Sequence, residues 1–260
     1  MVHNNRPRRS PAHSGPAAMR SCTGTLHRAS AIPAQLTETL AEFKLAVLAP
    51  GFPCFFAPTA FTDDTLLFGS IDASQPDFVC APPVFDAAAE AINANPDQVI
   101  VLWVTHLSSS SLEEDATAAR ALLLALLRAD PDGIPPGRPI AVADPHWDFW
   151  YRNIDFFINF SSAHHVLRNS RNLGSALTIV AQSRSSFDRL PEGGLRARSM
   201  IRERIHQFDD VAPSPSLGSH GLSPELPQFF LGDDNEPSPP LLTQSDYPEP
   251  SVLDPDTGDE

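Results

Sequence analysis

The segment 147–160 constrains the fold of this chain more than any other. Two short apolar runs lie on either side of Arg152 and Asn153, which is the pattern of a β-hairpin closed by a short polar turn. A hairpin pairs its strands in antiparallel orientation. We therefore predict a strand over 154–160 and an α+β fold, in which a mixed or antiparallel central sheet is flanked by helices.

The other predicted elements surround this hairpin without a regular alternation of strand and helix. Residues 98–105, QVIVLWVT, are continuously apolar and β-branched, which predicts a buried central strand. Hydrophobic spacing and end signals predict four helices, and shorter apolar runs predict further strands. The helices are expected at 37–48, 82–95, 112–129 (capped by Ser111) and 195–208, and the further strands at 66–68, 175–182 and 228–231.

The two ends of the chain have a different composition from its middle. Many of the 27 prolines lie there, the head is rich in Ser and Arg, and the tail is acidic. Such segments cannot bury enough apolar surface to offset chain entropy. We predict a disordered head over 1–35, one domain over 36–232, and a disordered tail over 233–260. The head also has the composition of an organelle transit peptide, although its prolines interrupt any amphipathic period.

Charge, cysteines and hydropathy exclude several classes of protein. The formal net charge of −14 argues against general binding of nucleic acid, which needs a basic surface. Cys22, Cys54 and Cys80 are odd in number and without paired spacing, so we expect free thiols in a reducing compartment. No apolar run approaches the ~20 residues of a membrane span. We expect a cytoplasmic protein that binds neither nucleic acid nor membrane.

Five segments, in order along most of the predicted domain, carry a resemblance to a known family. They are FPC at 52–54 with Ala57, DPHWDF at 144–149, AHHVLRNSR at 163–171, IRER at 201–204 followed by Phe208-Asp209, and QFFLGDDN at 228–235. Together these segments resemble the YqcI/YcgG family. The chain departs from the family pattern at Asp148, where the family favours Glu, and at the doubled histidine, where the register is ambiguous by one residue.

The resemblance implies a function that the composition does not. Many members have no known function, but some relatives look like haem-dependent enzymes that N-hydroxylate guanidino groups, including that of arginine. The resemblance therefore implies an oxidoreductase that uses haem iron to hydroxylate a guanidino or amino nitrogen of a small molecule. Motifs that would name another reaction, such as a phosphate-binding loop, G-x-S-x-G or H-E-x-x-H, are absent from the sequence.

The candidate haem ligands are His164 and His165. A neutral imidazole is a good axial ligand for haem iron when a second group holds its other ring nitrogen. Adjacent residues on a strand or extended loop point in opposite directions, so at most one of the two reaches a given site. Matching Arg168 to the arginine of the family motif places His165 in the ligand position, ahead of His164. The alternative is that both are polar loop residues after the strand at 154–160.

The other candidate residues of the haem site are Arg168, Arg171, Phe52 and Cys54. Arginines three apart share one face of a helical turn and suit bidentate binding of a haem propionate or a substrate carboxylate. The alternative for this pair is a solvated basic loop. Phe52 is a candidate pocket wall. Cys54 is a thiolate ligand in principle, but its apolar neighbours favour an inert, packed thiol.

Three further groups of polar residues have side chains suited to binding. His146 is a candidate second ligand or proton donor, Asp148 and Asp155 are candidate anchors for a cationic guanidino group, and 233–235 are expected to be solvated.

Two alternatives to the haem enzyme remain open at this point. One is a non-catalytic binding or regulatory protein of the same fold without a cofactor, and the other is a non-haem metal enzyme that uses His146 with His164 or His165.

Overall fold

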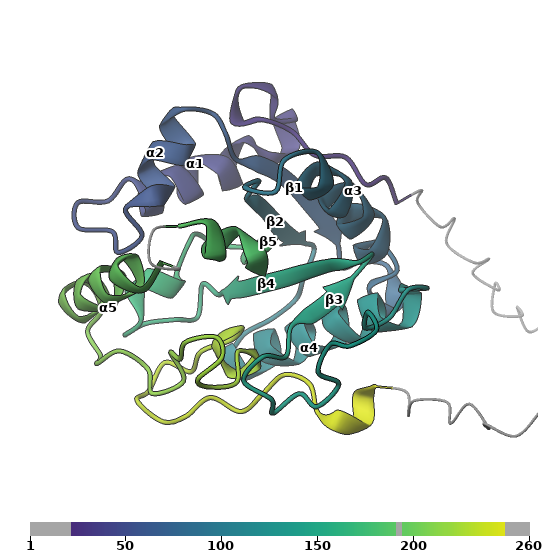
Figure 1. Cartoon of the computed structure of the whole chain (residues 1–260). Helices are drawn as coiled ribbons and strands as arrows, with labels where there is room; N and C mark the ends of the chain where they lie inside the picture. The colour runs from purple at the N-terminus through teal and green to yellow at the C-terminus, as the bar shows by residue number, and fades with distance from the viewer. Residues whose placement is uncertain (1–21, 191–193, 248–260) are drawn as a thin grey trace, which may run out of the picture.

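The computed structural model describes residues 22–190 and 194–247, which form a five-stranded mixed sheet with helices on both faces (Figure 1). The strand order is β1-β2-β5-β4-β3. β1 and β2 are parallel, and the other neighbours are antiparallel. The strands are β1 (Leu67–Asp72), β2 (Ile100–Thr105), β3 (Phe149–Tyr151), β4 (Ile154–Ser161) and β5 (Leu177–Ser183). The α+β fold with a mixed sheet is confirmed.

The hairpin predicted around Arg152 and Asn153 is formed by β3 and β4. Phe149 pairs with Phe156, and Tyr151 pairs with Ile154, so the turn has two residues. Arg152 and Asn153 have φ angles of 49° and 58°. Two consecutive positive φ angles are the signature of the primed turns whose twist matches that of the flanking strands.

Of the five α-helices within 22–190 and 194–247, four lie where hydrophobic spacing predicts them. Ser111 caps one of them as expected, since its Oγ accepts the N–H of Glu114 at 3.2 Å. A short helix was missed, and its sequence FAPTAFT carries a proline that is tolerated in a first helical turn. The helices are α1 (Thr37–Val47), α2 (Phe56–Thr62), α3 (Ala81–Ala94), α4 (Leu112–Ala129) and α5 (Leu195–Phe208).

Each face of the sheet is covered by its own pair of helices. On one face, buried side chains of α3 and α4, such as Phe85 and Leu122, pack against strand residues such as Ile179. On the other face, α1 packs over β1 and β2, where Phe68 stacks on Trp103 with ring centroids 5.3 Å apart. Alternate residues of β2 enter the two cores, so its continuous apolar run is buried on both faces of the sheet.

The strand predicted at 228–231 is wrong. The backbone there begins with a 3-10 turn, Leu226–Gln228, and continues along the free edge of β4. A backbone hydrogen bond joins this segment to β4, from the N–H of Phe160 to the carbonyl of Phe229 at 2.7 Å. Phe229, Phe230 and Leu231 are buried, so the apolar character that suggested a strand serves core packing instead.

The packed part of the chain extends beyond the predicted domain limits of 36 and 232. His27 forms a β-bridge with Phe68 on β1. Towards the other end, Leu242 is fully buried, and Arg120 of α4 pairs with Asp246 at 2.7 Å. Parts of the predicted head and tail therefore contribute to the core. The rest of both, 1–21 and 248–260, lies outside the described residues.

The expectation of three free thiols is wrong, because Cys22 and Cys80 form a disulfide with their Cα atoms 5.0 Å apart. The two cysteines are 58 residues apart in sequence, so only the fold reveals the pairing. The argument for a reducing compartment loses its basis, since disulfides are uncommon in such compartments. None of the helices in the described ranges has the length and apolar character that crossing a bilayer requires.

Candidate functional site

The candidate site is built around a bend, residues 162–171, that follows β4. The N–H of Ser162 donates to the carbonyl of Arg171 at 2.9 Å, which closes the base of the bend. A short 3-10 turn, Asn169–Arg171, reverses the chain towards β5. The four histidine and arginine residues proposed for the haem site therefore lie on one compact loop. They are His164, His165, Arg168 and Arg171.

His165 points into the protein, where both of its ring nitrogens face backbone groups. Its Nε2 lies 2.9 Å from the carbonyl of Leu231, and its Nδ1 lies 3.3 Å from the N–H of Ser162. The side chain is 2% exposed, and this burial lowers the pKa of the imidazole. A neutral ring that donates from Nε2 and accepts at Nδ1 satisfies both contacts, so His165 has no nitrogen left for a metal.

His164 points in the opposite direction, towards the first turn of α4. Its Nδ1 lies 2.8 Å from the buried carboxylate of Asp115, which also accepts a hydrogen bond from the hydroxyl of Ser162. Its Nε2 forms no hydrogen bond within 22–190 and 194–247, and its side chain is about one third exposed. An imidazole with Nδ1 held by a carboxylate and Nε2 open has the usual arrangement of a histidine that ligates a metal.

Arg168 and Arg171 have different surroundings. The Arg168 guanidinium is buried and donates to the carbonyls of Gly232 and Asp234 at 2.8 and 2.6 Å. Burial and the neighbouring Arg168 lower the pKa of Arg171 to about 10. The Nη2 of Arg171 donates weakly to the carbonyl of Gln228 at 3.5 Å, and its buried Nη1 has no hydrogen-bond partner among the described residues. Of the two arginines, only Arg171 retains an unused donor.

Comparison with known proteins identifies the family. The sequence profile of the YqcI/YcgG family matches residues 43–241. The chain belongs to the YqcI/YcgG family. This match includes the whole sheet and the bend.

Two curated relatives are similar to this YqcI/YcgG member. One, from Streptomyces lavendulae, is named "Putative N(omega)-hydroxy-L-arginine synthase DcsA"; it is 29% identical over 201 residues, which cover 72% of this chain and 75% of the relative. The other, "Uncharacterized protein YqcI" of Bacillus subtilis (strain 168), is 27% identical over 133 residues, which cover 49% and 52%. No solved structure matches the chain.

Three of the segments that resemble the YqcI/YcgG pattern meet at Arg168. Asp233, from the segment 228–235, accepts the backbone N–H groups of Val166, Leu167 and Arg168 at 2.8–3.0 Å. Asp209, which follows α5, accepts both the N–H and the hydroxyl of Ser170, at 2.7 and 2.8 Å. The expectation that the residues 233–235 are merely solvated is wrong for Asp233, which holds the bend in place.

Phe52 and Cys54 lie near the same region but belong to the core between α1 and α5. The ring of Phe52 is 8% exposed and meets the ring of Phe208 edge to face, with centroids 5.8 Å apart. Burial raises the pKa of the Cys54 thiol, which disfavours the thiolate that a metal would need. These contacts agree with the packed thiol that the sequence favours.

A second polar cluster lies at the opposite end of β4. Asp155 accepts the hydroxyl of Ser183 at 2.6 Å, and the Nε of Arg184 lies 2.7 Å from Glu225. Burial, and next Asp155, raise the pKa of Asp148 to about 6, while burial raises that of Glu225 to about 7. The guanidinium in this cluster is that of Arg184, which pairs with Glu225, while Asp155 accepts the hydroxyls of Ser183 and Ser185.

His146 lies beside this second cluster rather than beside the bend. Its ring meets that of His220 edge to face at 5.7 Å, and His220 Nε2 lies 3.1 Å from Asp148. No group of three or more metal-ligating side chains occurs among the described residues. The fold therefore does not bring His146 together with His164 or His165.

Asp115 is the residue of the candidate site that sequence reasoning missed. It lies in the first turn of α4, 49 residues before His164. Acidic residues in a first turn are ordinary, because they complement the helix dipole. Its burial is the distinguishing property, at 3% exposure, and no local pattern in the sequence indicates it.

Proposed function

We propose that this protein N-hydroxylates a guanidino or amino nitrogen of a small molecule, with haem as its cofactor. The observation that carries the proposal is the similarity to the relative named as an N(omega)-hydroxy-L-arginine synthase, which extends over about three quarters of both chains. The printed name of that relative, "Putative N(omega)-hydroxy-L-arginine synthase DcsA", describes the synthesis of an arginine hydroxylated on a guanidino nitrogen. A substrate that carries a guanidino group is the corresponding proposal for this chain.

The donor groups near the bend fit a haem with a single histidine ligand. His164 would be the ligand to a bound haem, because its Nε2 is open and its Nδ1 is held by a carboxylate, as in histidines that ligate metals. This reverses the sequence-based order, in which His165 came first, since backbone groups engage both nitrogens of His165. Arg171 has a buried donor without a partner and suits a propionate or a substrate carboxylate.

In this proposal the haem iron supplies the activation of dioxygen that N-hydroxylation requires. The chain supplies the remaining functions. Asp115 keeps the proton of His164 on Nδ1 and fixes the plane of the ring. Asp233 and Arg168 hold the loop that presents both residues. Phe52 and Cys54 pack in the adjoining core.

The experiment is an assay of the haem-loaded protein with a reductant, dioxygen and a panel that contains L-arginine, agmatine and a primary amine. We expect a product heavier by one oxygen atom, formed from a guanidino compound and abolished in the Asp115→Ala variant. The matched control is Asp132→Ala, an exposed acid in the connector after α4. The proposal fails if no member of the panel gains oxygen.

A non-catalytic binding protein of the same fold is the alternative, and the engagement of His165 and Arg168 by backbone groups favours it. It predicts a folded protein that takes up no haem and oxidises no member of the panel. A cytoplasmic location also remains a proposal. Fractionation tests it, and thiol labelling of freshly lysed cells would show whether Cys22 and Cys80 are oxidised there.

A further inference from the structure

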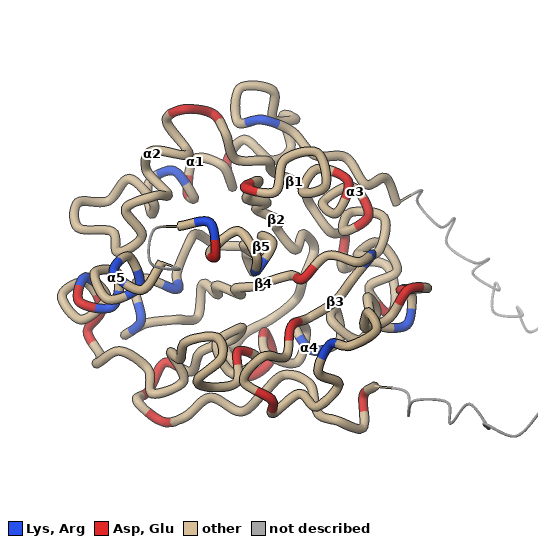
Figure 2. Tube along the Cα trace, in the orientation of Figure 1, with Lys and Arg blue, Asp and Glu red and all other residues tan. Residues whose placement is uncertain are grey.

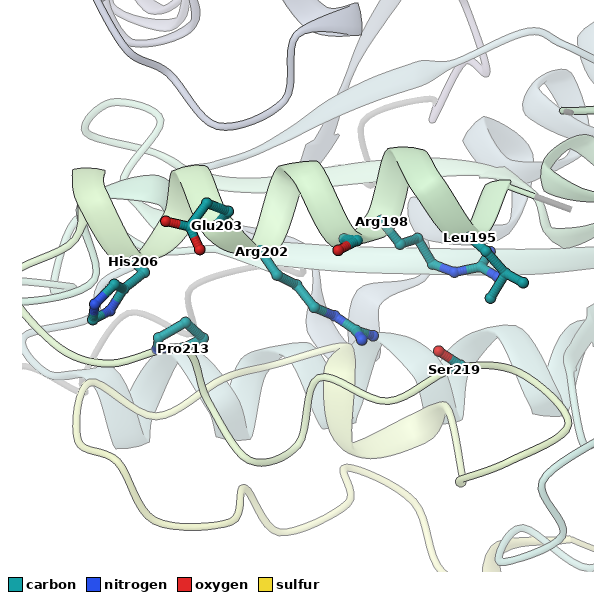
Figure 3. A pocket seen from close by; sticks show the side chains of 8 residues that line it. Leu195, Arg198, Arg202, Glu203, His206, Pro213 and Ser219 are labelled. Carbon is teal, nitrogen blue, oxygen red and sulfur yellow. The ribbon is translucent and has the colours of Figure 1, made fainter. Parts of the chain in front are cut away.

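A cavity of about 500 Å³ lies between α5 and the loop 213–219 (Figure 3). It does not border the bend, and it has no role in the proposed haem site. No residue of α5 within the described part of the chain is buried, and the cavity lies along the side of the helix that faces the loop 213–219. The volume is within the range of small-ligand sites.

The helix presents a row of basic side chains to the cavity. Arg198, Arg202 and His206 are spaced four residues apart, so they share one face of α5. Figure 3 shows the Arg202 side chain reaching from the helix into the space above the loop. Although the chain as a whole is acidic, basic residues gather on this helix (Figure 2).

In this row, Arg198 has a hydrogen-bond donor that is not used within 22–190 and 194–247. Its Nε is buried, and no described residue accepts a hydrogen bond from it. Burial, followed by the neighbouring charges of Arg184 and Arg202, lowers the pKa of Arg198. A buried donor without a partner costs free energy, which a bound acceptor would recover. Arg202 donates to the carbonyl of Gly218 and so fixes the loop wall.

Among the described residues, three carboxylates lie near these two arginines, and each has a partner of its own. Glu203 itself lines the cavity, and its carboxylate accepts a hydrogen bond from Gln207 at 3.1 Å. Glu225 pairs with Arg184 at 2.7 Å, and Asp188 pairs with the same guanidinium at 3.6 Å. Because Arg184 occupies both of the latter acids, the positive charge of Arg198 and Arg202 is left facing the cavity.

We propose that this cavity binds a small oxyanion, a carboxylate or a phosphate, through Arg198 and Arg202. Guanidinium groups match the geometry of both anions. The hydroxyls of Ser199 and Ser219 add neutral donors, and Leu195 and Pro213 provide apolar wall for the rest of an organic molecule. Carboxylates and phosphates both present negatively charged oxygen atoms to a guanidinium. The test therefore titrates one anion of each kind separately.

The test is isothermal titration calorimetry of the full chain, with inorganic phosphate in one arm and succinate in the other, at constant ionic strength. At least one anion should bind, and Arg198→Gln should weaken that binding about ten- to a hundredfold, the usual loss for a hydrogen bond to a charged group. Arg198→Lys keeps the positive charge but loses the planar group that can donate two hydrogen bonds to one anion, so it should give an intermediate affinity.

The matched control is Arg196→Gln, on the same helix but outside the cavity lining. It should bind like the unsubstituted protein. Binding of phosphate alone would assign a phosphate site, and binding of succinate alone would assign a carboxylate site. The proposal is overturned if neither anion binds, or if Arg196→Gln weakens binding as much as Arg198→Gln does.

Discussion

Asp233 is the residue whose substitution most directly tests how the bend is held. Its carboxylate accepts three consecutive backbone N–H groups, from Val166, Leu167 and Arg168. Hydrogen bonds to a charged acceptor contribute about 1.5–3 kcal/mol each when solvent is excluded. Val166 and Leu167 are exposed, so water would replace much of the hydrogen bonding of their N–H groups if the carboxylate were lost. The hydrogen bond from Arg168 is partly buried and is not replaced in this way. We therefore expect Asp233→Asn to cost about 2–3 kcal/mol of unfolding free energy.

Urea denaturation followed by tryptophan fluorescence measures this cost, with Asp234→Asn as the matched control. Asp234 is the next residue, and its side chain accepts only the nearby N–H of Glu236, at 3.2 Å, so its loss should change stability by less than about 0.5 kcal/mol. In a thermal melt, the same loss for Asp233→Asn corresponds to a Tm lower by about 5–10 °C for a domain of this size. Equal effects from both substitutions would refute the assigned role of Asp233.

Two other substitutions address the disulfide and the buried acids. Cys22→Ser should lower the unfolding free energy by about 4 kcal/mol, the chain-entropy value for a loop of this length, and dithiothreitol should then have no further effect in urea denaturation. Because burial raises the folded pKa of Glu225 to about 7, the folded state holds an extra proton between about pH 4.5 and pH 7, and stability falls as pH rises through that window. The Glu225→Gln variant should show a smaller fall than the unsubstituted protein when unfolding free energy is measured across the window. An unchanged pH slope, or a Cys22→Ser variant that still responds to dithiothreitol, would contradict these two accounts.

Local patterns predicted most of the fold. The hairpin was predictable because its two turn residues separate runs of strand-forming side chains, and the structure places both at positive φ. The helix after Ser111 was predictable from its cap and its acidic first turn. The segment 228–231 was mistaken for a strand, because a short apolar run serves equally well in a strand or in a loop that fills a core.

The candidate site could be predicted less well, because its contacts connect residues far apart in sequence. The resemblance identified the bend, but the sequence did not indicate which histidine faces inward. That orientation depends on Leu231, 66 residues after His165, and on Asp115, 49 residues before His164. The Cys22–Cys80 disulfide has the same origin, since neither cysteine has a near neighbour that would signal pairing.

The most direct test of the central claim is the absorption spectrum of the purified protein after addition of haem. The account predicts a Soret band shifted from that of free haem, lost in His164→Ala and retained in His146→Ala, an exposed histidine away from the bend. Asp115→Asn should keep the band but weaken haem affinity about ten- to a hundredfold, because the imidazole loses its supporting carboxylate. A spectrum equal to that of free haem, or a band that survives His164→Ala, would contradict the assignment.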